Sequence, residues 1–244
     1  MENTSYISLS RQMVMHHQMD VIANNLANMT TPGFKSERAT FAEQLQSVTA
    51  DEELSFVQNR AVLRDPSPGV LERTGNPLDV AINGKGYFTV QTPQGIKYTR
   101  DGSWQLDAEG TIVTTDGFPI LSDSDQPIVL GDDQLGAIVI GRDGSISTSK
   151  GSTLGRLKVV MFEDDRALRS DSGNLLTSDG TEAIPKPVEN PQISQGMIEN
   201  SNVVPITEMT NMIDISRGYQ SIQKMLETEH ELQRKAIQVL AQTA

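Results

Sequence analysis

Apolar side chains near the N-terminus recur at the spacing of an α-helix. Residues 5–29 contain neither proline nor glycine, and their apolar positions follow one another at intervals of three and four residues, which places them on one face. This stripe consists of Met15, Met19, Ile22, Leu26 and Met29, with Leu9 and Met13 on a neighbouring line. Pro32 and Gly33 then stop the pattern, because proline cannot continue a helix and glycine permits a turn. The sequence therefore predicts an amphipathic N-terminal helix.

A longer stripe of the same kind occupies the C-terminus. Its positions alternate at three and four residues and are Met212, Ile215, Tyr219, Ile222, Leu226, Glu229, Gln233, Ala236 and Leu240. Asn202 is the expected N-cap, with Pro205 in the first turn, where a missing N–H costs little. About 36 residues give a helix of about 54 Å, and the 3.5-residue period is typical of coiled-coil packing. An amphipathic helix lying on its own domain is the alternative.

Between Gly75 and Ile184 the pattern changes to short runs of Val, Ile, Phe, Tyr and Thr. These runs are separated by dipeptides that tolerate the positive φ angles of tight hairpin turns. The dipeptides are Asn83-Gly84, Asp101-Gly102, Asp116-Gly117, Asp143-Gly144 and Asp179-Gly180. Five turns of this type predict an antiparallel β domain.

Weaker patterning marks the segments on either side of this domain. Residues 36–74 favour an extended connector with a short helix around Phe41 to Val48. Three prolines, Pro185, Pro187 and Pro191, favour a stiff linker on the return. The predicted fold class is α+β, with a mainly antiparallel β domain flanked by long terminal helices. The predicted division is a helix and turn at 1–35, the connector at 36–74, the β domain at 75–190, and the linker with the second helix at 191–244.

Charge and composition exclude several classes of function. The 244 residues include 32 acidic and 20 basic side chains, a net charge of −12, so nucleic-acid phosphates and anionic bilayers are repelled. The absence of cysteine excludes disulfides, thiolate metal sites and cysteine nucleophiles. No secretory signal is expected, because Glu2 precedes the first basic residue and no apolar h-region follows. No apolar run is long enough to span a bilayer.

The histidines and one glycine-rich turn are the first candidates for ligand chemistry. His16 and His17 are adjacent and point about 100° apart on a helix, so they cannot chelate one metal ion as an i, i+4 pair would. His230 stands alone on the second helix. The Gly84-Lys85-Gly86 turn lacks a third glycine and precedes a predicted strand, so no helix N-terminus is available to bind phosphate. Surface or interface histidines and a structural turn are the simpler interpretations.

A serine–lysine pair and a group of carboxylates are the remaining candidates. Ser147 and Lys150 have the spacing that pairs a hydroxyl with a lysine base on a helix, but in the predicted strand they fall on opposite faces. Eight acidic residues lie between Asp101 and Asp133, yet they lack the ordered pattern of a calcium loop. A solvated acidic face is the simpler interpretation. We therefore expect no enzyme activity, no catalytic residue, no cofactor and no metal site.

Three ordered motifs resemble one bacterial family. The first is Ala23-Asn24-Asn25-Leu26-Ala27-Asn28 followed by Thr31-Pro32-Gly33-Phe34. The second comprises residues 76–88, Tyr98 to Gly102 and residues 114–121, and the third comprises Ser201-Asn202-Val203 with residues 209–219. Together they resemble the flagellar rod and hook proteins, and residues 154–160 are most similar to the proximal-rod type, with the distal-rod type second. Pro32 and Gly218 depart from the usual pattern, and Gly218 is expected to loosen or bend the second helix.

This resemblance implies a tubular axial assembly. In it the terminal helices would pair as an inner coiled coil, the β domain would face outward, and helical packing of subunits would transmit torque. The expected subunit interface consists of Leu9, Met13, Met15, Met19, Ile22, Asn24, Asn25, Leu26, Asn28, Met212, Ile215, Tyr219, Ile222, Leu226, Ala236 and Leu240. Physical chemistry adds that amides such as Asn24, Asn25 and Asn28 can bind neighbouring backbones and fix register, with solvation at a fraying helix end as the alternative.

The same resemblance implies partners and a location. The expected partners are other copies of the chain, rod proteins of the FlgB, FlgC and FlgG types, and the flagellar type III export apparatus. The expected location is the periplasmic rod of the basal body, reached without a cleaved signal peptide. A distal-rod or hook subunit is the alternative within the family. A β-domain adhesin or carbohydrate-binding module is the alternative of a different class.

Overall fold

The fold was analysed in a computed structural model that describes residues 2–49, 52–130, 138–148, 153–171, 174–178 and 183–243. The chain divides into two compact units. Unit 1 contains residues 1–27, 37–65 and 203–244, and unit 2 contains residues 28–36 and 66–202. Each unit draws on segments that are distant in sequence.

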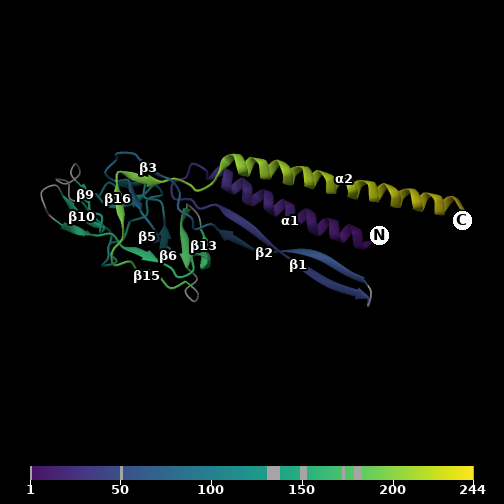
Figure 1. Cartoon of the computed structure of the whole chain (residues 1–244), viewed down its shortest axis with the longest axis horizontal. Helices are drawn as coiled ribbons and strands as arrows, with labels where there is room; N and C mark the ends of the chain where they lie inside the picture. Colours follow the sequence, from purple (N-terminus) through teal and green to yellow (C-terminus); the bar gives the residue numbers. More distant parts are fainter. Residues whose placement is uncertain are drawn as a thin grey trace. The chain divides into compact units, whose positions relative to one another are not determined.

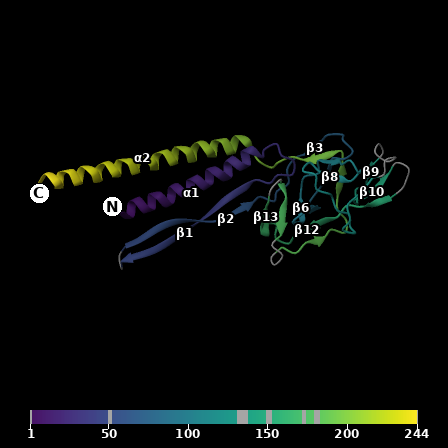
Figure 2. The same ribbon diagram turned by 180° about the vertical axis from the view of Figure 1, so that it is seen from behind.

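Unit 1 consists of two long helices and a β-hairpin (Figure 1). Helix α1 (Glu2–Ala27) ends at a turn over residues 28–33, where the sequence predicted the stop. Helix α2 (Pro205–Thr243) is one continuous helix of 39 residues. The two helices lie side by side and antiparallel in both views (Figures 1 and 2). This arrangement confirms the predicted pairing of the terminal helices.

The segment predicted as a connector instead forms the hairpin of unit 1. Strands β1 (Glu37–Thr49) and β2 (Glu52–Arg64) pair antiparallel from Glu37 opposite Arg64 to Thr49 opposite Glu52. The short helix predicted around Phe41 to Val48 is therefore wrong. A register shift between Thr40 and Phe41 interrupts the two-residue period that would have marked a strand. Cross-strand pairing determines the structure of this segment, and local sequence propensity does not reveal such pairing.

Unit 2 is built from short strands whose ladders are all antiparallel in the part that the structure describes. The strands are β3 (Leu71–Arg73), β4 (Val80–Ile82), β5 (Tyr87–Thr92), β6 (Gly95–Thr99), β7 (Trp104–Leu106), β8 (Ile112–Thr114), β9 (Ile138–Ile140), β10 (Ser145–Thr148), β11 (Thr153–Arg156), β12 (Val159–Met161), β13 (Leu168–Ser170), β14 (Leu176–Ser178), β15 (Lys186–Pro187), β16 (Ile193–Gln195) and β17 (Met197–Glu199), with a 3₁₀ turn, η2, at Asp165–Ala167. The largest sheet has the order β13-β14-β6-β5-β12-β15. The predicted antiparallel β region is confirmed.

Residues 186–199, which connect the β domain to α2, are part of this β structure. Strand β15 pairs with β12, β16 pairs with β4, and β17 pairs with β3. Of the three prolines predicted to stiffen a linker, Pro187 lies in β15 at a sheet edge, where proline is tolerated because its missing N–H faces away from the ladder, whereas Pro185 and Pro191 lie just outside β15 and β16.

The predicted turn dipeptides have different outcomes. Asp116-Gly117 and Asp143-Gly144 are turns between antiparallel partners, with φ of 83° at Gly117 and 86° at Gly144. Asn83-Gly84 and Asp101-Gly102 are not hairpin turns, because β4 pairs with β16 rather than β5, and no ladder joins β6 to β7. Gly102 instead permits a close crossing, since a Cβ there would lie 1.6 Å from the Val80 carbonyl oxygen. Asp179-Gly180 lies outside the described residues.

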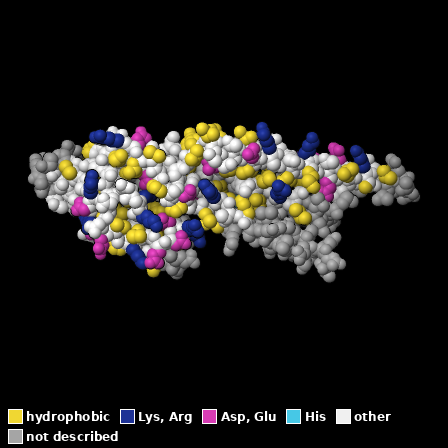
Figure 3. Space-filling view, in the orientation of Figure 1, with side chains coloured by type: hydrophobic (Ala, Val, Ile, Leu, Met, Phe, Trp, Pro, Cys, Tyr) yellow, Lys and Arg dark blue, Asp and Glu magenta, His cyan; other side chains and the backbone are white. Residues whose placement is uncertain are grey.

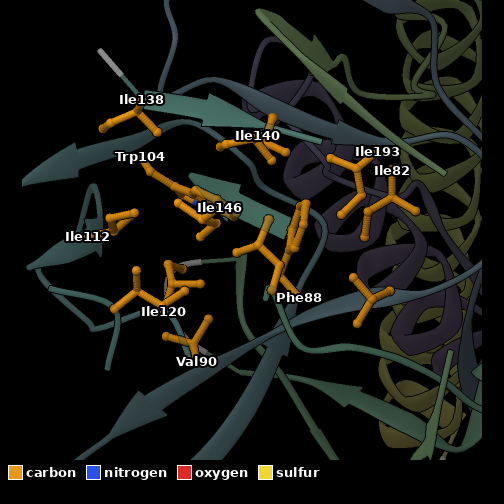
Figure 4. Packing of buried hydrophobic residues seen from close by; sticks show 14 of the residues in the cluster. Ile82, Phe88, Val90, Trp104, Ile112, Ile120, Ile138, Ile140, Ile146 and Ile193 are labelled. Atoms are coloured by element: carbon orange, nitrogen blue, oxygen red, sulfur yellow. The ribbon is translucent and has the colours of Figure 1, made fainter. Parts of the chain in front are cut away.

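The core of unit 2 has two apolar clusters. The larger gathers side chains from most of the strands around Phe88, whose ring meets Trp104 edge-on at 4.8 Å between centroids (Figure 4). The smaller contains Tyr87, Tyr98 and Phe162. Ring contacts of this kind stabilise a core beyond the area that they bury. Unit 2 therefore encloses its apolar side chains within its own fold.

Candidate functional site

The candidate site is the seam between α1 and α2 in unit 1. In α2 the predicted stripe from Met212 to Gln233 is half-buried at every position, while most of the intervening residues are exposed. In α1 the facing residues Met15 and Met19 are half-buried and Ile22 is buried. This alternation follows the heptad pattern, because positions a and d face the partner helix.

Gly218 of α2 lies against Met15 of α1. A Cβ on this residue would lie 3.0 Å from the Met15 Cε atom. The glycine therefore makes room for a methionine of α1. Gly218 does not interrupt α2, which continues as one element from Pro205 to Thr243.

Several predicted interface residues are not in the seam. Leu9 and Met13 are 50% and 66% exposed, and they line a groove of about 400 Å³ with His16, His17 and Tyr219. Ala236 is also exposed. The side chain of Leu240 lies outside the described part of the structure. Leu9, Met13 and Ala236 therefore lie outside the seam between α1 and α2.

The asparagines at the end of α1 bind backbone and side-chain groups. Asn25 is 1% exposed. Its side-chain nitrogen donates to the Glu37 carbonyl oxygen at 2.9 Å, and its side-chain oxygen accepts the Glu37 N–H at 2.8 Å. Asn24 donates to the Glu37 carboxylate at 3.2 Å, and Asn28 accepts from the Thr31 hydroxyl at 3.1 Å. The predicted backbone-binding role is confirmed for Asn25, which fixes the start of β1 against α1.

A second groove of unit 1 lies between α1, β1 and the start of α2. It has a volume of about 530 Å³. Its apolar floor includes Val21, Ile22 and Ile215, and its carboxylates include Glu208 and Asp214. Glu37 and Arg38 of β1 also line it, so carboxylates and a guanidinium surround the apolar floor.

A buried charge cluster in unit 2 was not predicted. Lys35 and Arg100 both form ion pairs with Glu199, with Arg100 Nε at 3.1 Å from Glu199 Oε2, and all three side chains are buried. The Lys35 ammonium also donates to the Ser67 carbonyl at 2.8 Å, and the Gly69 N–H donates to Glu199 Oε1 at 2.9 Å. Because buried charges are costly unless paired and hydrogen-bonded, this cluster ties segments of unit 2 that are distant in sequence.

The Pro32-Gly33 turn is shaped by the same cluster of contacts. Gly33 has a φ of 71°, and its N–H donates to the Glu199 carbonyl at 2.6 Å. A Cβ at this position would lie 2.5 Å from the Arg100 carbonyl carbon. Glycine is required here by both its φ and the close approach, which gives a physical reason for glycine in the Thr31-Pro32-Gly33-Phe34 motif.

Asn202 does not cap α2. Its side-chain oxygen accepts the Ser36 N–H at 2.7 Å, and its amide donates to the Ser67 carbonyl at 3.0 Å. Helix α2 begins at Pro205, and the Val204 carbonyl accepts the Glu208 N–H, so Val204 rather than Asn202 occupies the N-cap position. The prediction of an Asn202 N-cap is wrong.

The ligand candidates from the sequence are not drawn into a reactive cluster. His16 lies 3.1 Å from the Asp20 carboxylate on an exposed helix face. Among the described residues, no group of three or more His, Asp or Glu side chains is placed to hold a metal ion. Strand β5 follows the Gly84-Lys85-Gly86 turn, as expected. Ser147 lies in β10, whereas Lys150 is outside the described residues.

The acidic segment is mostly solvated. Asp123 and Asp125 are exposed, as predicted, and Asp133 is outside the described residues. Asp101 is half-buried, and burial raises the pKa of its carboxyl, partly offset by hydrogen bonds from Ser103. Within the part of the chain that the structure describes, neither helix is long and apolar enough to cross a bilayer.

Three family models match successive parts of the chain. Residues 6–35 match the model described as flagella basal body rod protein. Residues 81–148 match the flagellar hook protein FlgE/F/G D1 domain, and residues 194–239 match the flagellar basal body rod FlgEFG protein C-terminal region. The first and last matches lie largely on α1 and α2, and the middle match lies in unit 2.

Curated relatives are similar along nearly the whole length. The flagellar basal-body rod protein FlgF of Caulobacter vibrioides is 38% identical, with 98% of each chain covered, and FlgF of Mesorhizobium japonicum is 31% identical with the same coverage. The rod protein FlgG of Buchnera aphidicola from Acyrthosiphon pisum is 34% identical over 91% of this chain and 93% of the relative. These relatives are structural rod proteins and not enzymes. The chain belongs to the flagellar basal-body rod protein family.

Proposed function

We propose that this rod-family chain is a proximal-rod subunit that transmits torque through helical packing of its terminal helices. The observation that best supports this proposal is that α1 and α2 pack against each other along a seam and still have exposed apolar side chains, including Leu9 and Met13. A long, regular helix pair resists twisting along its length, because each turn is fixed by hydrogen bonds and by the seam. The identity of 38% with FlgF of Caulobacter vibrioides, against 34% with the FlgG relative of Buchnera aphidicola, supports the proximal position.

The proposed subunit interface lies on both helices. It consists of Leu9, Met13, Met15, Met19, Ile22, Asn24, Asn25, Leu26 and Asn28 at the N-terminus, and of Met212, Ile215, Tyr219, Ile222, Leu226, Ala236 and Leu240 at the C-terminus. In this proposal the seam residues make the pair rigid and the exposed ones contact neighbours. Asn25 acts within the chain, since both ends of its amide already bind Glu37.

The proposed partners are further copies of this chain and rod proteins of the FlgB, FlgC and FlgG types. Export by the flagellar type III apparatus would deliver the chain to the periplasmic rod without a cleaved signal. The terminal helices, from residues 1–35 and 191–244, would form the inner layer of a tube, and the β domain at 75–190 would face outward. Similarity to FlgG relatives favours the distal rod as the second candidate.

Position in the rod can be tested in purified basal bodies. A small epitope tag in a surface loop of unit 2, visualised with gold-labelled antibody, should mark a narrow band at the cytoplasmic end of the rod. A band further out would favour the distal rod. Absence of the chain from basal bodies that contain other rod proteins would contradict the proposal.

Torque transmission needs a separate measurement. Ile222→Ala removes part of the seam, and Gln223→Ala changes the exposed neighbour. In a bead assay on single motors, the Ile222 variant should fail at lower load than wild type, whereas the Gln223 variant should match wild type. Equal behaviour of the two variants would count against a load-bearing seam.

A further inference from the structure

We propose that Lys35, Glu199 and Asn202 form a fixed joint, which holds together the segments that connect unit 2 to the rest of the chain and passes torque into unit 2 as one body. This inference rests on the proposed function, because it specifies how torque from the terminal helices reaches the β region. It concerns contacts within unit 2 alone. The position of the connecting segments, the contacts among them and the burial of their charges support it.

The chain passes between its two units at four points. Unit 2 contains residues 28–36 and 66–202, so these points follow residues 27, 36, 65 and 202. On the unit 2 side they are adjoined by residues 28–36, 66–69 and 199–202, which are called the connecting segments. Force that reaches unit 2 along the backbone passes through these three segments, because they are its covalent connections to unit 1.

Glu199 contacts both of the other connecting segments. Its buried carboxylate pairs with the Lys35 ammonium, and its Oε1 atom accepts the Gly69 N–H at 2.9 Å. Its carbonyl oxygen accepts the Gly33 N–H at 2.6 Å. Lys35 in turn donates to the Ser67 carbonyl at 2.8 Å. One ion pair and its hydrogen bonds therefore bind the three segments to one another.

Asn202 makes a second link among the same segments. Its side-chain oxygen accepts the Ser36 N–H at 2.7 Å, and its amide donates to the Ser67 carbonyl at 3.0 Å. Ser36 and Asn202 are the last residues of their segments before the chain enters unit 1. A Cβ on Gly69 would lie 1.8 Å from the Asn200 carbonyl oxygen, so the segments also pack closely. They are held together up to the points at which they leave unit 2.

Arg100 links the joint to the largest sheet of unit 2. Its Nε atom lies 3.1 Å from Glu199 Oε2, and its other two nitrogens donate to the Gly84 and Gly86 carbonyls. The turn that contains these glycines directly precedes β5, and Arg100 directly follows β6. Strands β5 and β6 are neighbours in the middle of the six-stranded sheet. A displacement of Glu199 is therefore passed to the centre of that sheet.

Stability alone does not explain why these charges are buried. The side chains of Lys35, Arg100 and Glu199 are 3%, 6% and 1% exposed, whereas Figure 3 shows charged side chains of both signs at the surface of unit 2. Apolar side chains of similar volume often stabilise a protein as well as a buried ion pair does. Hydrogen bonds to charged groups add geometric specificity, so they fix the segments in one arrangement. This property suits a joint under load.

Two buried lysines of unit 2 allow a matched comparison. Lys35 pairs with Glu199 in the joint, whereas Lys97, in β6, pairs with Asp171 at 2.6 Å and lies outside the connecting segments. Lys35→Met and Lys97→Met each remove one ammonium from an ion pair and keep a long, unbranched side chain. In the Lys35 variant Glu199 retains Arg100 as its counter-charge, so unit 2 is expected to fold. Each full-length variant replaces the wild-type chain in the bacterium.

Hydrogen exchange on the purified full-length chain measures the joint itself. In Lys35→Met, the amides of Gly33, Ser36 and Gly69, which donate within the joint, should exchange at least about tenfold faster than in wild type, because hydrogen bonds to a charged group are lost. Lys97→Met should leave the exchange of these three amides unchanged. Unchanged exchange in Lys35→Met would show that the ion pair does not hold the segments.

Motor torque separates a mechanical role from a purely structural one. Both variants should be present in isolated basal bodies at the wild-type amount, and both should lower the melting temperature of unit 2. In a bead assay on single motors, Lys35→Met should lose torque at high load and match wild type at low load. Lys97→Met should match wild type at both loads. Equal torque of the two variants at high load would overturn the inference, whether or not the seam variants behave as proposed.

A second pair of variants covers failure of Lys35→Met to enter the rod. Asn202→Ala breaks the second link and keeps the ion pair, and its control is Asn76→Ala, which removes a hydrogen bond to Asp79 outside the joint. The same loss of torque at high load is expected for Asn202→Ala alone. Absence of both joint variants from rods that accept both controls would show that the contacts serve folding rather than load, and would overturn the inference. Absence of the wild-type chain from basal bodies would contradict the proposed function itself.

Discussion

Apolar side chains in unit 2 are enclosed by unit 2 itself, whereas in unit 1 most of them stay half-exposed along two helices. Phe88, Val90 and Ile112 of unit 2 are fully buried. In the described part of unit 1, the buried apolar side chains are Val21, Ile22 and Val203. Since burial of apolar area is the main stabilising contribution to folding, we expect unit 2 to fold alone and unit 1 to be less stable on its own.

Proteolysis should show this difference most clearly. We expect protease treatment of the purified chain to remove α1 and most of α2 while unit 2 survives, because helices with one half-covered seam unfold locally. The surviving core should begin near residue 28 rather than 36, since Phe34, Lys35 and Ser36 are buried in unit 2. Mass spectrometry of the fragments gives the boundaries. Equal protection of the helices and unit 2 would contradict the comparison.

Removing the buried acid of unit 2 should have the next largest effect. Glu199→Gln leaves Lys35 and Arg100 buried without their counter-charge, and loss of one partner of a buried pair costs about 3 to 5 kcal/mol. Chemical denaturation of the full chain should show an earlier unfolding transition for unit 2. Glu72→Gln, on the exposed strand β3, is the control and should match wild type. An unchanged transition in Glu199→Gln would mean that the cluster adds nothing to stability.

A change in the seam should leave unit 2 intact and affect assembly. Leu226→Asp places a charge between the helices at a cost of about 2 to 3 kcal/mol, so incorporation into basal bodies should fall by tenfold or more. The melting temperature of unit 2 should not change. Glu227→Gln alters the exposed neighbour and should incorporate normally. Normal incorporation of Leu226→Asp would place the interface on another element.

The pattern of apolar residues was sufficient to predict the helices and the class of the fold. Periodicity of 3.5 residues extends over the whole of α2, so the stripe from Met212 to Gln233 and its facing residues in α1 could be located. The hairpin at β1 and β2 could not, because its strands are stabilised by pairing with each other and interrupted by a register shift. Local patterns carry no information about such partners.

The charge cluster escaped prediction for a related reason. Lys35, Arg100 and Glu199 are far apart in sequence and are of types that are mostly exposed. Only the folded chain brings them together. The sequence held one weak sign that Lys35 is buried. The Pro32-Gly33 turn stands directly before Phe34 and Lys35, and a glycine in such a turn indicates that another backbone segment packs closely against it.

At Gly84 in unit 2, a substitution is expected to strain the backbone without a steric clash. Gly84 has a φ of 110°, and no atom lies within 4 Å of a Cβ placed there. Gly84→Val should therefore cost about 1 to 3 kcal/mol through backbone strain alone, measured as a lower melting temperature. Lys85→Val, at the exposed neighbour, should have little effect. A normal melting temperature in Gly84→Val, together with a nucleotide- or sugar-dependent shift in wild type, would instead support a ligand-binding turn.

The smallest expected effect is a pH dependence at Asp101 in unit 2. Burial is the largest influence on this carboxyl and raises its pKa in the folded state above the ordinary value of 3.8. A raised pKa means that the folded state favours the protonated form, so the group stabilises unit 2 below 3.8 and this contribution is lost as the pH rises through the folded value. At pH 7 the buried carboxylate is a net cost. Asp101→Asn keeps an acceptor for the Ser103 N–H, which donates to Oδ1 at 2.9 Å, and removes the charge.

The melting temperature of Asp101→Asn should therefore exceed that of wild type by a few degrees at pH 7, and the difference should shrink as the pH is lowered toward 3.8. Asp123→Asn is the control on an exposed residue of unit 2, and it should stay within about 0.5 kcal/mol of wild type. Asp101 belongs to unit 2, whereas α1 and α2 belong to unit 1. The fraction of α1 and α2 that survives protease treatment should therefore change with pH in the same way in wild type and in Asp101→Asn. A pH-independent difference would show that the Ser103 hydrogen bonds outweigh burial. A change in helix protection would show that the two units are coupled more tightly than their separate cores require.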